Sequence, residues 1–153
     1  MNDYMKIAID EAYKGIKNNE GGPFGCVITK NGSIIAKAHN QVVKKNDATC
    51  HGEMQAIRMA SKKLQSFNLS GCELYTTGEP CPMCLSAIMW AKIDKVYYGA
   101  ALKDNAKIGF RDIEIDNFFG KRKVDKRFLV QIDERECLKL FKDYINMGRK
   151  TNY

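Results

Sequence analysis

The sequence predicts one α/β domain in which helices pack on a mixed β-sheet. Strand-like apolar runs alternate with segments of helical periodicity, the first two runs flank Asn31-Gly32, and 153 residues suit a single domain. A chain of this length hides roughly 68–70% of its unfolded surface on folding. Its 44% hydrophobic and 28% charged residues fit a globular protein and exclude a collagen-like or disordered chain.

The N-terminal part of the chain predicts a helix followed by a β-hairpin. Apolar residues at helical spacing follow Asp3, which we expect to be the N-cap, and Gly21-Gly22 ends this region. Residues 24–29 and 33–38 are apolar, β-rich runs. Asn31-Gly32 between them is the dipeptide most typical of a two-residue hairpin turn.

The rest of the chain predicts further helices and strands in alternation. Periodicity predicts helices over about 51–63, 80–91 and 135–147, and β-rich runs predict strands over 73–76, 95–98 and 128–132. The helix over 80–91 is apolar on nearly every side, so we expect it to be buried. This alternation favours a layered α/β architecture.

The chain is basic, with 25 Lys and Arg against 18 Asp and Glu and a formal charge of +7. Such a balance allows an acidic partner such as nucleic acid without showing one. The densest basic stretch, Lys121-Arg122-Lys123 with Lys126-Arg127, is interpreted as a solvated loop or strand edge. No apolar run approaches a membrane span and the N-terminus lacks a signal pattern, so we expect a cytoplasmic protein without a membrane partner.

Six cysteines in a cytoplasmic chain are not expected to form disulfides. Only Cys81 and Cys84 have the spacing of a metal-binding pair. The others lie among apolar neighbours and are interpreted as small buried side chains: Cys26, Cys50, Cys72 and Cys137.

Cys81, Cys84 and His51 form a candidate metal-binding set. The two cysteines are three residues apart at a helix start, which places both sulfurs on one face. Pro82 suits the first helical turn, and the helix N-terminus favours ionised thiols. Two thiolates and one imidazole provide three zinc ligands and leave a fourth position for water, which is typical of a catalytic site.

Glu53 is the candidate general acid and base. It follows His51 by two residues, and side chains at this spacing on a helix point in different directions. Glu53 is therefore free to stand beside the water and take its proton instead of binding the metal.

Two other interpretations of these residues stay open. Cys81 and Cys84 alone would also suit a redox pair, although redox chemistry does not need His51 and Glu53. A closed structural zinc site, as in a non-catalytic interaction module, would take Cys50 or Cys72 as its fourth ligand. His39 has no such companions and is interpreted as an ordinary residue at a strand end.

The pattern His51-Gly-Glu53 followed by Pro80-Cys-Pro-Met-Cys84 resembles the cytidine/deoxycytidylate deaminase superfamily. Within it, the chain is most similar to the small bacterial guanine deaminases, over roughly residues 5–112 and more weakly beyond. The further matching stretches are Gly21-Gly-Pro-Phe-Gly25, Asn40, Asn46-Asp47, the run from Glu79 to Trp90, and Gly109-Phe-Arg-Asp112.

This resemblance implies a three-layer α/β/α sandwich with a central mixed five-stranded sheet, built as one domain from residues 1–153. It implies one Zn²⁺ per subunit and a homodimer in which the C-terminal segment, about 134–153, is exchanged and completes the partner's site. It also implies hydrolysis of guanine to xanthine and ammonia in purine salvage or catabolism.

The resemblance further assigns a role to individual residues. His51, Cys81 and Cys84 would hold zinc, and Glu53 would carry protons. Five residues would contact the base: Asn40 by hydrogen bonding, Phe24 by stacking, Trp90 as a wall, Asp112 by reading polar edges, and Tyr153 by closing the pocket. Glu134 lies near a C-terminal glutamate of the family that assists proton transfer.

Two departures keep other substrates open. Gly52 stands where the guanine enzymes have alanine, and the same glycine occurs in fungal-type cytosine deaminases, which residues 133–137 also resemble faintly. A tRNA adenosine deaminase shares the zinc motif and would use the charge of +7. The alternatives are therefore a tRNA adenosine deaminase and a deaminase of cytosine or another small base.

Overall fold

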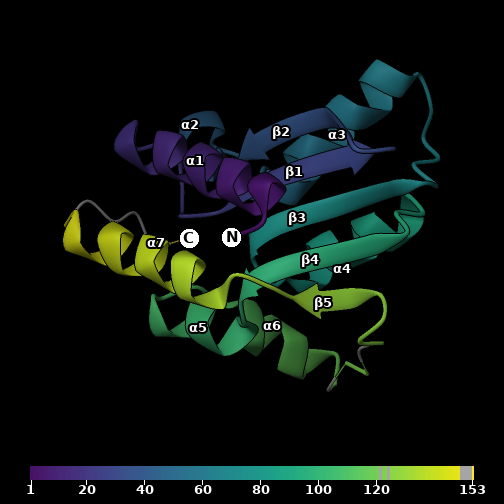
Figure 1. The fold of residues 1–153 in the computed structure, drawn as a ribbon. Helices are drawn as coiled ribbons and strands as arrows, with labels where there is room; N and C mark the ends of the chain where they lie inside the picture. The colour runs from purple at the N-terminus through teal and green to yellow at the C-terminus, as the bar shows by residue number, and fades with distance from the viewer. Residues whose placement is uncertain (121, 124, 149–152) are drawn as a thin grey trace.

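The computed structural model describes residues 1–120, 122–123, 125–148 and 153. Its elements along the chain (Figure 1) are α1 (Asp3–Lys17), β1 (Gly25–Lys30), β2 (Ser33–His39), α2 (Val42–Lys45), α3 (Gly52–Leu64), β3 (Cys72–Gly78), α4 (Pro82–Trp90), β4 (Lys95–Ala100), α5 (Leu102–Lys107), α6 (Asp112–Phe118), β5 (Leu129–Gln131) and α7 (Glu134–Asn146). The short helices α2, α5 and α6 are additions to the elements that periodicity predicted.

The five strands form one sheet in the order β2-β1-β3-β4-β5. β1 pairs antiparallel with β2 and β3, whereas β3, β4 and β5 run parallel. Asn31 and Gly32, with φ of 49° and 76°, form the turn of the opening hairpin. The expected mixed five-stranded sheet is therefore confirmed.

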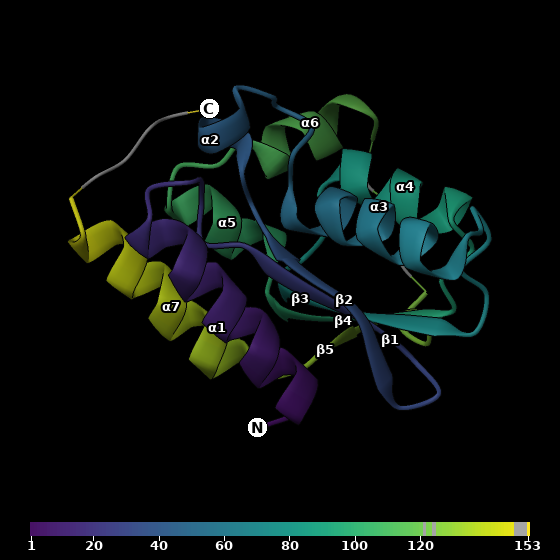
Figure 2. The same cartoon turned by 90° about the horizontal axis from the view of Figure 1, so that it is seen from above.

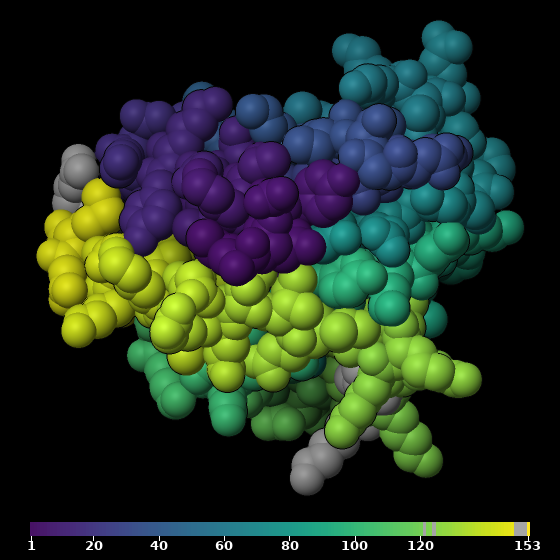
Figure 3. Space-filling view, in the orientation of Figure 1, coloured from purple at the N-terminus to yellow at the C-terminus, as the bar shows by residue number. Residues whose placement is uncertain are grey.

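Helices cover both faces of this sheet. Figures 1 and 2 show α1 and α7 side by side on one face and α3 and α4 on the other. The space-filling view in Figure 3 shows α1 in purple resting directly against α7 in yellow. Each face has its own apolar core: Met5, Val27 and Leu140 belong to one, and Ile28, Leu74 and Ile88 to the other. The predicted three-layer arrangement is confirmed.

The first helix is capped by a different residue from the one expected. Asn2 has an extended backbone, and its side chain accepts hydrogen bonds from the N–H groups of Tyr4 and Met5 at 2.9 and 3.1 Å. Asp3 already lies inside the helix, where its charge faces the positive end of the helix dipole. The predicted cap at Asp3 was wrong by one residue.

The expectation of a fully buried helix over 80–91 was also wrong. α4 begins at Pro82, and only Cys84 and Ile88 within it are buried. The sheet covers one side of the helix, so Met89 and Trp90 are 64% and 85% exposed. The apolar sequence correctly indicated a helix, but the rest of this chain covers only one side of it.

His39 ends β2, as expected, but it is more than an ordinary strand-end residue. Its ring nitrogens lie 3.0 Å from a carboxylate oxygen of Glu11 and 2.6 Å from one of Glu20, and it is 7% exposed. Burial works to raise the pKa of Glu20, but hydrogen bonds from Gln41, His39 and Lys44 outweigh it and lower that pKa to about 2. This network joins α1, β2 and α2 just before Asn40.

The basic stretch around residue 122 is only partly the solvated loop expected. Lys121 lies outside the described residues. Arg122 is partly buried and bonded, because its Nε donates to Asp116 at 2.7 Å and its terminal nitrogen donates to the carbonyl of Pro80 at 2.8 Å. Arg127 is 92% exposed at its side chain, as expected of a solvated residue. Among the described residues, no helix is both long and apolar enough to cross a bilayer.

The N-cap of α1 can be tested by two neighbouring substitutions. Replacing Asn2 with alanine removes the acceptor of two N–H groups, so we expect a loss of about 0.5–2 kcal/mol in the free energy of unfolding. Asp3→Ala removes only a charge near the helix dipole and should cost less. Urea denaturation of the two variants measures both losses. A larger loss for Asp3→Ala than for Asn2→Ala would contradict this assignment and place the cap at residue 3.

Candidate active site

The predicted metal-binding residues meet where α3 and α4 begin. His51 immediately precedes α3, Cys81 is the N-cap of α4, and Cys84 lies in the first turn of α4 behind Pro82. The Nδ1 atom of His51 lies 3.6 Å from the sulfur of Cys81 and 3.5 Å from that of Cys84. The starts of two helices thus bring the side chains of these three residues together.

The spacing of these atoms fits a zinc ion. Zn–S bonds of about 2.3 Å and Zn–N bonds of about 2.0–2.1 Å, at tetrahedral angles, place sulfur and nitrogen about 3.6 Å apart. The observed separations match this value. Among the described residues, the only group of metal-ligand side chains close enough to share an ion is His51, Cys81 and Cys84. Cys50 and Cys72 lie outside it, so the structure offers no fourth cysteine for a closed site.

The charges of the cluster also suit a cation. A hydrogen bond from the thiol of Cys84, together with His51, lowers the pKa of Cys81 to about 4. The proton remains on Cys84, whose pKa is raised by that hydrogen bond and by burial. A metal ion would displace it, because a coordinating thiol is deprotonated outright.

Glu53 stands beside the cluster in the first turn of α3. It is only 5% exposed, and one of its carboxylate oxygens accepts a hydrogen bond from the hydroxyl of Thr76 at 3.2 Å. Burial raises the pKa of Glu53, with the nearby Cys81 acting in the same direction. A carboxylate with a raised pKa next to a metal-ligand cluster is suited to accept and return a proton.

Asn40 and Asp112 line the same inner cavity. The side-chain oxygen of Asn40 accepts a hydrogen bond from the N–H of Val42 at 3.0 Å, while its amide nitrogen is buried with no partner among the described residues. Asp112 begins α6 and accepts a hydrogen bond from Asn105 at 2.9 Å. Burial raises the pKa of Asp112, and the hydrogen bond from Asn105 opposes this effect.

Aromatic rings close the pocket. Phe24 meets Phe110 edge to face, with ring centroids 4.9 Å apart, and Phe110 in turn meets Tyr153 at 5.3 Å. The hydroxyl of Tyr153 accepts a hydrogen bond from the N–H of Gly22 at 2.7 Å. A side chain at Gly22 would place its Cβ 2.6 Å from Phe110 and 2.7 Å from Tyr153, so glycine is needed for this closure.

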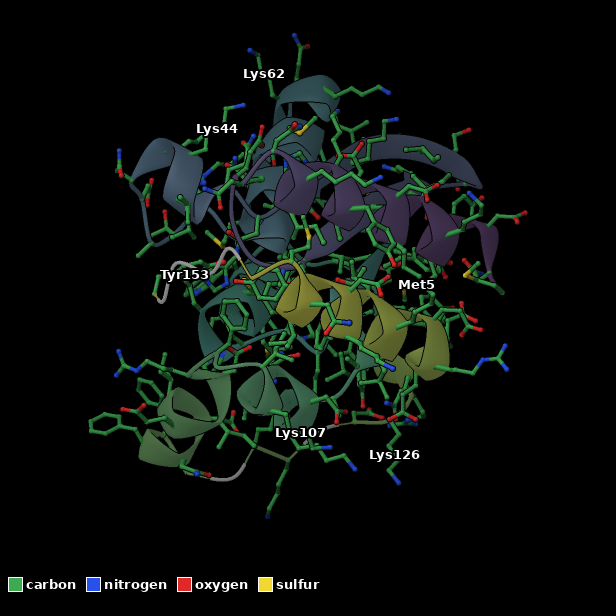
Figure 4. All side chains as sticks on the ribbon, turned by 90° about the vertical axis from the view of Figure 1, so that its left-hand side faces the viewer. Met5, Lys44, Lys62, Lys107, Lys126 and Tyr153 are labelled. Carbon is green, nitrogen blue, oxygen red and sulfur yellow. The ribbon has the colours of Figure 1, made fainter. Side chains whose placement is uncertain are left out.

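The C-terminal residue, Tyr153, lines the pocket. Figure 2 shows the chain end beside α2, and Figure 4 places Tyr153 at a height between Lys44 of α2 and Lys107 of α5. Tyr153 comes here from the same chain as the pocket that it covers. Residues 149–152 of the segment expected to be exchanged lie outside the described residues.

The pocket has an inner and an outer part. The inner cavity of about 20 Å³ lies against Glu53, Asn40 and Asp112, and it has room for about one water. The outer cavity of about 300 Å³ opens beside Met83, Ile115 and Tyr153. Five residues line both parts: His51, Cys81, Phe110, Asp112 and Tyr153.

The structure brings together most of the predicted site residues and leaves two apart. The residues that line the pocket are His51, Cys81, Glu53, Asn40, Phe24, Asp112 and Tyr153. The third ligand residue, Cys84, is fully buried and belongs to the metal-binding cluster. Trp90 is 85% exposed at the far end of α4 and does not wall the pocket of this chain. Glu134 is exposed at the start of α7 and lines neither cavity.

Sequence reasoning missed three residues of the inner cavity, which are Glu79, Asn105 and Phe110. Phe110 lies in the segment from Gly109 to Asp112 that carries part of the family resemblance, so its position next to Asp112 could have identified it. Glu79 was likewise inside the run before Cys81. No motif marked Asn105, because its position depends on how α5 packs against that run.

Comparison with known proteins agrees with this site. Residues 1–100 match the family model described as the cytidine and deoxycytidylate deaminase zinc-binding region. A guanine deaminase of Bacillus subtilis is 42% identical over 98% of this chain and 97% of its own length. A tRNA-specific adenosine deaminase of Aquifex aeolicus is 42% identical over 69% of each chain.

A solved structure is similar over the whole chain. The crystal structure of a guanine deaminase from Bacillus subtilis aligns with a TM-score of 0.73 at 40% identity, covering 100% of this chain and 99% of that one. The match includes the sheet, the helices on both faces and the segment that carries the ligand residues. This chain belongs to the cytidine and deoxycytidylate deaminase family of zinc-dependent enzymes.

Proposed function

We propose that this protein is a guanine deaminase, which hydrolyses guanine to xanthine and ammonia. The observation that carries this proposal is the closure of the pocket by Phe110 and Tyr153. The outer cavity of about 300 Å³ is at the lower end of the range for small-molecule pockets. Its size suits a free base better than a nucleotide within a folded RNA.

The comparisons support the same substrate. The structural similarity to a guanine deaminase covers 100% of this chain, and so includes Asp112 and Tyr153, which line the pocket. The similarity to the Aquifex tRNA-specific enzyme covers about two thirds of the chain. Other tRNA-specific adenosine deaminases match 95–96% of this chain, but at 33–36% identity, so the support for guanine is the higher identity over the full length.

The reaction breaks the bond between C2 and the amino group of guanine and adds the oxygen of one water. Zinc, when bound, is a Lewis acid that lowers the pKa of a coordinated water towards about 7. Glu53 takes a proton from the attacking water and passes it to N3 of the ring. It then carries the second proton to the departing amine, which leaves as ammonia.

The pocket walls would hold the base in the orientation that this reaction needs. The free amide nitrogen of Asn40 donates to an acceptor on the purine, and the carboxylate of Asp112 accepts from its N–H groups. Phe24 provides a flat face for the ring. A site built for one pattern of donors and acceptors rejects a mismatched base strongly.

A cytoplasmic location is part of the proposal. Cys81 and Cys84 must stay reduced to bind a metal, and the cytoplasm keeps thiols reduced.

The substrate can be tested by ammonia release from zinc-loaded protein. We expect release from guanine, and little from cytosine, adenine, their nucleosides or tRNA. Glu53→Gln should lower turnover of guanine by about 10²–10⁴-fold while one zinc per chain remains bound, because only proton transfer is lost. Glu114→Gln, an exposed carboxylate of α6, is the matched control. Faster release from adenosine in tRNA than from guanine would contradict the proposed substrate.

The open metal site predicts different effects for two neighbouring cysteines. Cys81→Ala should lose zinc and lower the melting temperature of the purified protein, because metal binding contributes to folding free energy. Cys50→Ala should keep one zinc per chain, since Cys50 is outside the cluster. Zinc analysis showing metal loss in Cys50→Ala would instead indicate a closed, structural site.

We also propose a homodimer of this single domain, with the segment of about 134–153 exchanged between subunits. Exposed apolar side chains on α4 and beside α6 support a second copy on that surface: Met89, Trp90, Phe118 and Phe119. In an exchanged dimer, Tyr153 of one subunit would take the position that the same residue occupies here. Trp90 and Glu134 would then act through the dimer instead of within one chain.

Exchange can be tested by co-expressing two inactive variants. One carries Glu53→Gln, and the other lacks Tyr153. In an exchanged heterodimer the intact tail of the first completes the intact site of the second, so about a quarter of the sites should be active. Measured guanine turnover at the level of the separate variants would show that each tail serves its own chain.

A further inference from the structure

Asn105 is a buried amide that joins two parts of the site. It lies on α5 and is 1% exposed. Its amide nitrogen donates to the carboxylate of Asp112 at 2.9 Å and to the backbone carbonyl of Glu79 at 3.4 Å. Glu79 precedes the ligand Cys81 by two residues, so one side chain connects the metal-binding turn to the residue that faces the base.

The orientation of this amide follows from its partners. Both partner atoms are acceptors, so the nitrogen must face them and the oxygen must point away. That oxygen is buried and has no partner among the described residues. A buried acceptor without a hydrogen bond costs about 1–3 kcal/mol, which is typical of a group that a ligand or a water completes.

The end of β3 leaves space for this amide. A Cβ atom at Gly78 would lie 3.1 Å from the side-chain oxygen of Asn105 and 3.0 Å from the ring of Phe24. Glycine at this position therefore lets the amide and the aromatic wall approach the same strand end. Asn105 is held between that strand end and α6, where a smaller side chain would leave Asp112 without its partner.

Asp112 has little else to hold it in place. The chain turns sharply before it at Gly109, where φ is +97°, and α6 itself has no buried residue. Within the described residues, the hydrogen bond from Asn105 is the one side-chain hydrogen bond to the Asp112 carboxylate, which forms no ion pair. The direction of that carboxylate thus depends on Asn105.

We propose that Asn105 is a positioning residue, which sets the Asp112 carboxylate at a fixed place relative to the metal-binding turn and so contributes to recognition of the base. This inference rests on the proposed role of Asp112 in binding a nucleobase. One hydrogen of the Asn105 amide bonds to the Glu79 carbonyl, beside the metal-binding turn. The other bonds to the Asp112 carboxylate, which would contact the base.

A double-mutant cycle tests this coupling. Asn105→Ala should lower kcat/KM for guanine by about 10–100-fold, mostly through KM, because a hydrogen bond to a charged group orients a binding residue. In an Asp112→Asn background the same change should cost less than about threefold, because there is no longer a charged group to orient. Zinc content should stay at one per chain throughout.

Two further variants keep the test decisive. Asn105→Asp has nearly the same volume and serves if the alanine variant does not fold; it should be at least as harmful, because it places a second carboxylate beside Asp112. Asn117→Ala, an exposed asparagine of α6, is the matched control and should change neither kcat nor KM.

Two results would overturn the role of Asn105. One is an equal loss of kcat/KM in the wild-type and Asp112→Asn backgrounds, which means that Asn105 acts independently of Asp112. The other is a loss of zinc that accounts for the whole loss of activity. Wild-type protein that deaminates another base but not guanine would refute the proposed substrate alone, and the cycle would then be measured with that base.

Discussion

The site depends on the meeting of two helix N-termini beyond the carboxyl ends of β2 and β3. α3 follows the β2 edge and α4 follows β3, and both begin within contact distance of each other. The positive end of a helix dipole stabilises negative charge, and the first turn of each helix carries groups that can be anionic. These groups are Glu53 in α3 and the two cysteines at the start of α4. Moving either helix by one turn would separate His51 from the sulfurs and remove the metal-binding geometry.

The metal-binding residues and three of the pocket residues come from different parts of the chain. Zinc ligands and Glu53 come from residues 51–84, whereas Phe110, Asp112 and Tyr153 come from the C-terminal third. The family model covers residues 1–100, so it includes the ligand residues and Glu53 and ends before these three pocket residues. Phe24 and Asn40, which line the same pocket, lie within it.

Some features were predictable because they depend on neighbours in the sequence. Asn31-Gly32 identified the hairpin, and the spacing of Cys81 and Cys84 placed two ligands on one helix turn. The capping residue was wrong by one position, since Asn2 and Asp3 have equal capping preference and only backbone geometry separates them. His39 looked ordinary because its partners, Glu11 and Glu20, are 28 and 19 residues away.

The amino-acid sequence by itself determined the chemistry: a histidine, two cysteines and a glutamate whose spacing suits an open zinc site. Only the tertiary structure decided which side chains surround that site. It brought Phe110 and Asn105 into the pocket and left Trp90 85% exposed at the end of its helix. The physical reason is that the spacing of residues within one helix fixes the direction in which each side chain points from that helix. The packing of α5, α6 and the chain end against the sheet depends instead on contacts between residues far apart in the chain.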